Sequence, residues 1–170
     1  MEFFEKIRPG SVPDRNSIST LFNNETKALK LLEESFINEP KIDHYPFPKL
    51  IKATEYSDYY SITMTNCGVD ARVNAKLVES QKNIQPVNLY NTVECIINNL
   101  RNTRMLHNDI KSVNVCINKN GQVSLVDFNR ARIVSTDVAE AYYKKVTLAS
   151  EKFAWYLMLA KNPWSILYYF

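Results

Sequence analysis

Glycine is scarce in this chain of 170 residues, which contains three: Gly10, Gly68 and Gly121. They are too far apart to form the G-x-G-x-x-G turn of a dinucleotide-binding fold or a Walker A phosphate loop. Both devices need clustered glycines, because the backbone must approach the phosphates closely. The sequence therefore excludes dinucleotide-binding and P-loop proteins.

Histidine and cysteine are also few, with two histidines and three cysteines at wide spacing. Neither count suits a zinc site or a disulfide framework. We expect Cys67, Cys95 and Cys116 to be free, buried thiols in a reducing compartment.

Long apolar runs and basic clusters are missing as well. The chain begins with charged residues where a signal peptide needs an apolar segment. The longest late apolar run, 153–160, is far shorter than the ~20 residues of a spanning helix. The net charge is +3 without any Lys/Arg run, so we expect neither membrane nor nucleic-acid binding. We predict a cytoplasmic protein, in the host cytoplasm or the virion if the chain is viral.

What is present fits one folded domain over residues 1–170. The apolar fraction of 45% and charged fraction of 23% are ordinary for a globular protein, and the chain is long enough to bury a core. Apolar periodicity predicts an α+β fold. The expected strands are 3–8, 49–54 and 59–65, and the expected helices are 19–38, 89–104 and 149–159.

Several boundaries have their own signals. Ser19 is the predicted N-cap of the first helix. The prolines at 45–48 predict a rigid connector, and 66–68 breaks the strand pattern like a linker. The aromatic end, 164–170, is either packed in the core or a partner surface.

Glu25 lies on the apolar stripe of the first predicted helix. A buried carboxylate is costly unless a cation meets it. Lys6 on the preceding strand is the nearest candidate. The alternative is that Glu25 lies at the edge of the stripe and reaches water.

The most specific signal is the stretch 106–129, which reads L-H-N-D-I-K-S-V-N-V-C-I-N-K-N-G-Q-V-S-L-V-D-F-N. An H-x-D-x-K-x-x-N spacing is formed by His107, Asp109, Lys111 and Asn114. The Asn120-Gly121 pair predicts a hairpin turn before Asp127.

These residue types match the needs of phosphoryl transfer, which are an oriented nucleophile, a bridging Mg²⁺ and neutralised charge. Asp109 can orient a hydroxyl group, and Lys111 can meet the transferred phosphate. Asn114 and Asp127 offer the hard oxygen ligands that Mg²⁺ prefers.

The stretch resembles the catalytic and metal-binding loops of the protein-kinase superfamily. The resemblance implies ATP and Mg²⁺ as cofactors, with Asn114 and Asp127 as metal ligands. It also implies that Lys6 is the strand-three lysine and Glu25 its helix-C partner. Met64 looks like the gatekeeper, and Thr65 to Cys67 look like the hinge that contacts adenine.

The implied fold is a kinase-like, two-lobed α+β fold with a reduced N-lobe sheet (1–66) and a short, mainly helical C-lobe (67–170). The chain departs from the family pattern at several points. The first two strands and the Gly-rich loop are expected to be absent, and no A-P-E follows. Asn108 replaces the usual arginine. Asn129 replaces the glycine of D-F-G, and because asparagine tolerates positive φ we expect the turn to be kept.

Three functions remain open. The first is an ATP-dependent phosphotransferase of the Ser/Thr protein-kinase type, with a protein substrate. The second is a pseudokinase that acts as a binding or scaffold module for a protein partner. The third is a kinase of small molecules. In each case the exposed edge of the first strand suggests self-association.

Overall fold

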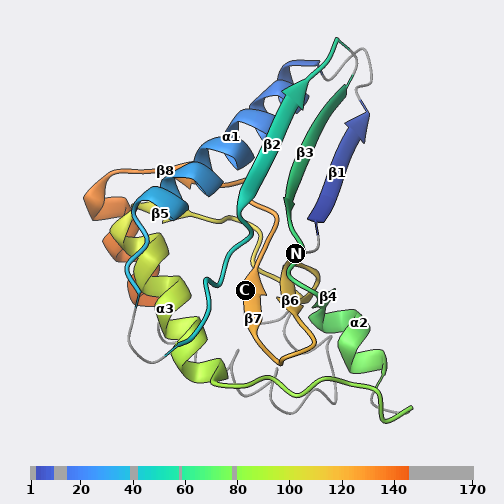
Figure 1. Ribbon diagram of the computed structural model, residues 1–170. Helices are drawn as coiled ribbons and strands as arrows, with labels where there is room; N and C mark the ends of the chain where they lie inside the picture. The colour runs from blue at the N-terminus through green and yellow to red at the C-terminus, as the bar shows by residue number, and fades with distance from the viewer. Residues whose placement is uncertain (1–2, 10–14, 39–41, 58, 78–79, 146–170) are drawn as a thin grey trace.

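The computed structural model describes residues 3–9, 15–38, 42–57, 59–77 and 80–145 (Figure 1). It is a small α+β protein with antiparallel sheets. The predicted helix at 149–159 and the aromatic end at 164–170 lie outside the described residues.

The first sheet contains β1 (Phe3–Pro9), β3 (Tyr59–Thr65) and β2 (Leu50–Glu55) in the order β1-β3-β2. The strand predicted over 59–65 is confirmed, and it buries Tyr60, Ile62 and Met64 on one face. Lys6 pairs with Ile62 across the strands. Directly paired residues share a face of the sheet, so Lys6 lies on the face that packs against α1.

Helix α1 covers that face (Figure 1) and spans Arg15–Glu34. Its Ala28, Leu29 and Leu32 are buried in the same core as the first sheet. The prediction that Ser19 caps the helix is wrong, because the helix begins one turn earlier and Ser19 lies inside it.

The helix also ends before the predicted residue Asn38. The side chain of Asn99 explains the early end: its Oδ1 accepts from the Ile37 N–H at 2.8 Å, and its Nδ2 donates to the Ile37 carbonyl at 3.0 Å. These two bonds satisfy backbone groups that would otherwise continue the helix.

A second sheet of short strands has the order β4-β6-β7 (β4 Val69–Asp70, β6 Val115–Ile117, β7 Val123–Leu125). The hairpin predicted around Gly121 is confirmed, with Gly121 at φ +77°. The alternation predicted from Val113 begins only at Val115, because Ser112–Asn114 forms a 3₁₀ turn, η2. The connector joins this sheet through a bond from the Leu125 N–H to the Pro46 carbonyl at 3.0 Å.

Helix α3 (Leu89–Asn102) begins where the sequence predicts and ends two residues earlier. The Thr103 hydroxyl donates to the Asn99 carbonyl at 2.9 Å, and Arg104 adopts φ +54°, which stops the helix. The chain then enters β5 (Met105–Leu106), which pairs with β8 (Arg132–Ile133). A further helical segment covers 136–145.

The shortest elements were not predicted from the sequence. Strands β4, β5 and β8 have two residues each, and α2 (Ala71–Lys76) has six. Segments of this length are too short to show a hydrophobic period. Across the described ranges, no helix combines the length and the apolar character that crossing a membrane requires.

Replacing Asn99 should destabilise the fold. Asn99→Ala leaves the Ile37 backbone groups without their partner, so we expect a loss of about 1–3 kcal/mol in the free energy of unfolding. Urea unfolding followed by circular dichroism measures it.

The matched control is Asn102→Ala on the same helix, where the side chain is exposed and we expect a change within about 0.5 kcal/mol. Equal effects at both positions would contradict the role given to Asn99.

Candidate active site

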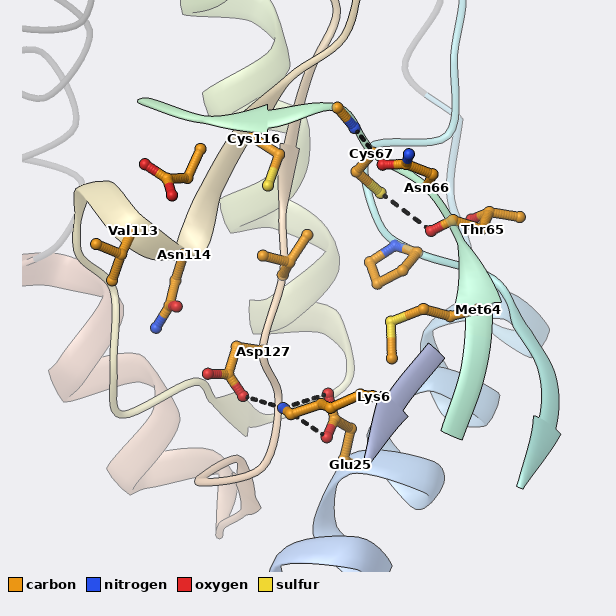
Figure 2. Close-up of a pocket in the computed structure, with 14 residues that line it drawn as sticks. Lys6, Glu25, Met64, Thr65, Asn66, Cys67, Val113, Asn114, Cys116 and Asp127 are labelled. Atoms are coloured by element: carbon orange, nitrogen blue, oxygen red, sulfur yellow. Dashed lines mark hydrogen bonds and ion pairs between the residues drawn. The ribbon is translucent and has the colours of Figure 1, made fainter. Parts of the chain in front are cut away.

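A cleft of about 310 Å³ lies between the two larger sheets and α1. Its walls include all the residues predicted to bind nucleotide or metal: Lys6, Glu25, Met64, Thr65, Cys67, Asn114 and Asp127 (Figure 2). They come from β1, α1, β3, the 66–68 segment and both ends of the β6–β7 hairpin. The volume lies at the low end of the range for small-molecule sites, about 300–1,000 Å³.

The ammonium group of Lys6 binds two carboxylates at once. Its Nζ lies 3.0 Å from Glu25 Oε2 and 2.6 Å from Asp127 Oδ1 (Figure 2). The Glu25 side chain is 1% exposed and that of Lys6 is 14% exposed. The alternative that Glu25 reaches water is therefore wrong. The strand and helix positions bring the two together, because Lys6 faces α1 and Glu25 faces the core.

Asp127 is held in a strained backbone conformation. Its φ is +66°, in the left-handed region that non-glycine residues rarely adopt. On one side, Val126 donates its N–H to the Asn114 carbonyl at 2.9 Å. On the other side, Phe128 is fully buried. These anchors aim the Asp127 carboxylate into the cleft, and strain of this kind clusters at functional sites.

The turn at Asn129 does not use the positive φ that asparagine would tolerate. Asn129 is not among the described residues with positive φ, whereas Asp127 is. Asn129 is buried, and its carbonyl accepts a bond from Asn24 Nδ2 at 3.1 Å. A turn is present here, because the Ala131 N–H donates to the Phe128 carbonyl at 3.0 Å, and the left-handed residue Asp127 lies just before it.

His107 is a buried structural residue next to the site. Its Nδ1 accepts the Asp109 N–H at 3.2 Å, and its Nε2 lies 2.9 Å from the Val126 carbonyl. Burial lowers the pKa of His107 and outweighs the bond to Val126. The neutral ring with its proton on Nε2 satisfies both contacts. His107 thereby ties the loop before Asp109 to the segment before Asp127.

Asp109, Lys111 and Asn114 form a compact group beside the cleft. Asp109 Oδ2 lies 2.9 Å from Lys111 Nζ and accepts a bond from Asn114 Nδ2 at 2.9 Å. The same Nδ2 donates to the Asp109 carbonyl at 2.8 Å. Because the amide nitrogen is engaged twice, the amide oxygen of Asn114 is the atom suited to a cation.

The pKa of Asp109 is lowered. Partial burial acts to raise it, but the hydrogen bond and charge of Lys111 and the bond from Asn114 outweigh that effect. Asp109 is therefore ionised at neutral pH. Asp109 and Lys111 do not line the cleft itself; Asn114 connects them to it.

The segment predicted to act as a hinge has a constrained backbone. The Thr65 N–H donates to the Lys49 carbonyl at 3.0 Å, so this donor is already used. Burial raises the pKa of the Cys67 thiol to about 11, which keeps it protonated. Gly68 has φ +102°, and a Cβ there would lie 2.2 Å from the Ile117 carbonyl oxygen. Glycine is required at this crossing of the chain.

Some residues of the cleft wall were missed by sequence reasoning. Pro48, Val113 and Cys116 contribute to it, and so does Asp70. Asp70 is the N-cap of α2, where its Oδ1 accepts the Val73 N–H at 2.8 Å. No local signal marks these residues, because their meeting depends on tertiary packing.

Comparison with known proteins gives limited but consistent support. No family model matches the chain. A stretch of 45 residues is 47% identical to the serine/threonine-protein kinase Nek3 of Mus musculus. That stretch is 26% of this chain and 9% of the Nek3 protein. The similarity points to a kinase relationship over about a quarter of the chain, and the α+β architecture is compatible with a reduced kinase-like fold.

Breaking the Lys6 contacts should destabilise the fold strongly. Lys6→Met leaves Glu25 buried without its cation, so we expect a loss of about 3–5 kcal/mol in the free energy of unfolding. The double variant Lys6→Met/Glu25→Gln should recover part of this loss, because no buried charge remains.

Arg101→Met is the control, since Arg101 and Glu140 form an ion pair in which both side chains are 49% exposed. We expect it to cost less than about 1 kcal/mol. Thermal and urea unfolding compare the unmodified chain with four variants, which are Lys6→Met, Glu25→Gln, the double variant and Arg101→Met. Additive single effects of Lys6→Met and Glu25→Gln would contradict the pairing.

The lowered pKa of Asp109 predicts a pH dependence of stability. A carboxyl group with a depressed folded-state pKa stabilises the fold above its ordinary value of 3.8, and this contribution is lost as pH falls through the folded pKa. The stability difference between the protein and Asp109→Asn should therefore be largest near neutral pH and shrink below pH 3.8. Urea unfolding of both proteins across this pH range measures the difference. A stability difference that grows as pH falls would contradict the prediction.

Proposed function

We propose that this chain is an ATP- and Mg²⁺-dependent phosphotransferase with a reduced, two-lobed kinase-like fold. The reaction is transfer of the γ-phosphate to a Ser/Thr hydroxyl of a protein substrate. One observation carries the proposal: Lys6 bridges Glu25 and Asp127, from segments far apart in the chain, within one cleft. The short similarity to a serine/threonine kinase supports it.

The charges in the cleft suit a magnesium nucleotide. The ammonium group of Lys6 lies between the carboxylates of Glu25 and Asp127, and Asp70 adds a third carboxylate to the wall. The described residues that line the cleft therefore carry an excess of two negative charges. Asn114 adds a neutral oxygen donor beside them. Hard oxygen donors with excess negative charge are what Mg²⁺ selects. In this proposal Asp127 and Asn114 would hold the ion, which would supply positive charge against the phosphate groups.

Lys6 then exchanges one partner for another. In the nucleotide complex its ammonium group stays on Glu25 and turns from Asp127 to the phosphate oxygens. The ion pair with Glu25 keeps the Lys6 ammonium group in the cleft, because separating a buried carboxylate from its cation is costly. The polypeptide walls at Met64 and at Thr65 to Cys67 accept the adenine.

The Asp109 group acts on the acceptor side. Its carboxylate is ionised, so it can accept a hydrogen bond from a substrate hydroxyl and orient the oxygen for attack. Lys111, 2.9 Å from Asp109, neutralises charge on the phosphate as it is transferred. Asn114 holds the Asp109 loop in register with the metal side of the cleft.

A second function is favoured by one specific contact. The Lys6–Asp127 ion pair, at 2.6 Å, occupies the two groups that nucleotide and metal need. If that pair is more stable than the nucleotide complex, the cleft stays closed to Mg²⁺-ATP. The chain would then be a pseudokinase that acts as a binding or scaffold module.

Calorimetry with Mg²⁺-ATP separates the two functions. We expect binding that depends on Mg²⁺, and an affinity that falls at least about tenfold in Asp127→Asn. Asparagine is chosen because it tolerates the positive φ of this position. Asp70→Asn is the matched control in the same cleft wall, because asparagine also caps helices well. Absence of binding at millimolar Mg²⁺-ATP would favour the scaffold.

Transfer itself is tested at Asp109. Asp109→Asn should lower the turnover number by at least about 100-fold, the usual contribution of a positioned acid or base. Binding of Mg²⁺-ATP should stay within about twofold, because Asp109 lies outside the cleft wall. Phosphate incorporation into a generic Ser/Thr substrate is the readout, and full activity in the variant would rule out this role for Asp109.

A further inference from the structure

A second concave surface lies on the far side of α1 from the candidate active site. Helical spacing places Lys27, Lys30 and Glu34 on the face opposite Glu25. Two adjoining hollows of about 250 and 810 Å³ follow this face. They share Lys27 and Ile133, so they form one continuous groove between α1, the end of α3 and strands β5 and β8, which Figure 1 shows side by side.

This basic groove concentrates positive charge. Among the residues that the structure describes, its walls carry the cations Lys27, Lys30, Arg104 and Arg132 and the single anion Glu34, an excess of three positive charges. The whole chain has a net charge of +3, so the remaining charges balance. In the part of the chain that the structure describes, no carboxylate forms an ion pair with any of the four cations.

The groove also offers apolar surface between the charges. Ile133 is 39% exposed, and Leu31 is half-buried. Arg104 stands at the rim in the left-handed conformation, at φ +54°. A glycine would adopt that conformation without strain, so an arginine here favours a role for its side chain. A groove with apolar contacts and cationic rims matches a ligand that is both apolar and acidic.

We propose that the basic groove binds an acidic, amphipathic peptide segment of a partner protein. Guanidinium and ammonium groups on the rims would pair with its carboxylates, while its apolar side chains contact Leu31 and Ile133. The chain's own residues 146–170 do not supply such a segment, since they carry one glutamate against two lysines. The proposal does not depend on phosphotransfer in the cleft.

Nucleic acid fits the groove less well than an acidic peptide. Binding of single strands combines positive charge with aromatic side chains on which bases stack. The described residues that line the two hollows include no aromatic side chain, and Glu34 would repel phosphates. Competition by a single-stranded oligonucleotide is therefore one outcome of the test rather than the proposal.

The test uses fluorescence anisotropy with a labelled helical peptide that carries Glu at i and i+4 and Leu at i+3. The comparison peptide has Gln in place of each Glu. We expect the Glu peptide to bind the full chain at least about tenfold more tightly than the Gln peptide, with affinity that falls as salt rises.

Two variants with the same change in net charge locate the site. Lys30→Glu lies in the groove, whereas Lys119→Glu lies at the exposed tip of the β6–β7 hairpin. Lys30→Glu should lose about tenfold in affinity and Lys119→Glu less than about twofold.

Three results would overturn the proposal: equal binding of the two peptides, equal losses in the two variants, or displacement of the peptide by an oligonucleotide at lower concentration than by unlabelled peptide. Both positions are exposed, so both variants should fold, which circular dichroism verifies.

Discussion

The contact on which the candidate site depends is the ammonium group of Lys6 between Glu25 and Asp127. It joins β1, α1 and the segment after β7 at one point. Without it, two carboxylates would face each other in a partly dry cleft, and a buried carboxylate without a cation is among the costliest features a fold can have. The position of α1 against the sheet is therefore coupled to the charge balance of the cleft. The same contact leaves one excess negative charge, which is the property that makes the cleft suitable for a divalent cation.

A row of aromatic rings leads to the two loops that carry the acidic residues of the site. Ring centroids are 4.8 Å apart for Phe36 and Tyr45, 5.5 Å for Tyr45 and Phe47, 5.9 Å for Phe47 and Phe128, and 4.7 Å for Phe128 and His107. The row runs from the chain just after α1, through the proline-rich connector, to the two loops of the site. Phe128 directly follows Asp127, and His107 precedes Asp109 by two residues. Aromatic rings prefer edge-to-face arrangements of this kind, and Phe47, Phe128 and His107 are fully or almost fully buried. The row therefore connects the backbone next to Asp127 and Asp109 to the core.

Helix α1 has different chemistry on its two faces. One face is apolar except for Glu25, and it packs on the sheet and faces the cleft. The other is exposed, mostly basic, and lines a groove with β5 and β8. The first face belongs to the proposed nucleotide site and the second to the proposed partner surface, and neither proposal requires the other. A phosphotransferase and a scaffold would both make use of the second face.

The sequence by itself predicted two of the long elements closely, and it pointed to polar residues that the structure places in or beside one cleft. It did not predict the helical segment at 136–145. The strand at 59–65 follows from strict alternation, and the start of α3 follows from helical periodicity, because each element buries one face. The spacing from His107 to Asp127 is likewise local, and it was sufficient to place Asp109, Lys111 and Asn114 on one loop. The tertiary structure alone decided the rest. The early end of α1 depends on Asn99 from another helix, and the left-handed residue after β7 is Asp127 rather than Asn129 because buried neighbours anchor both sides of it. The apolar cleft wall and the basic groove arise where separate segments meet, and residues brought together by packing have no common signal along the chain.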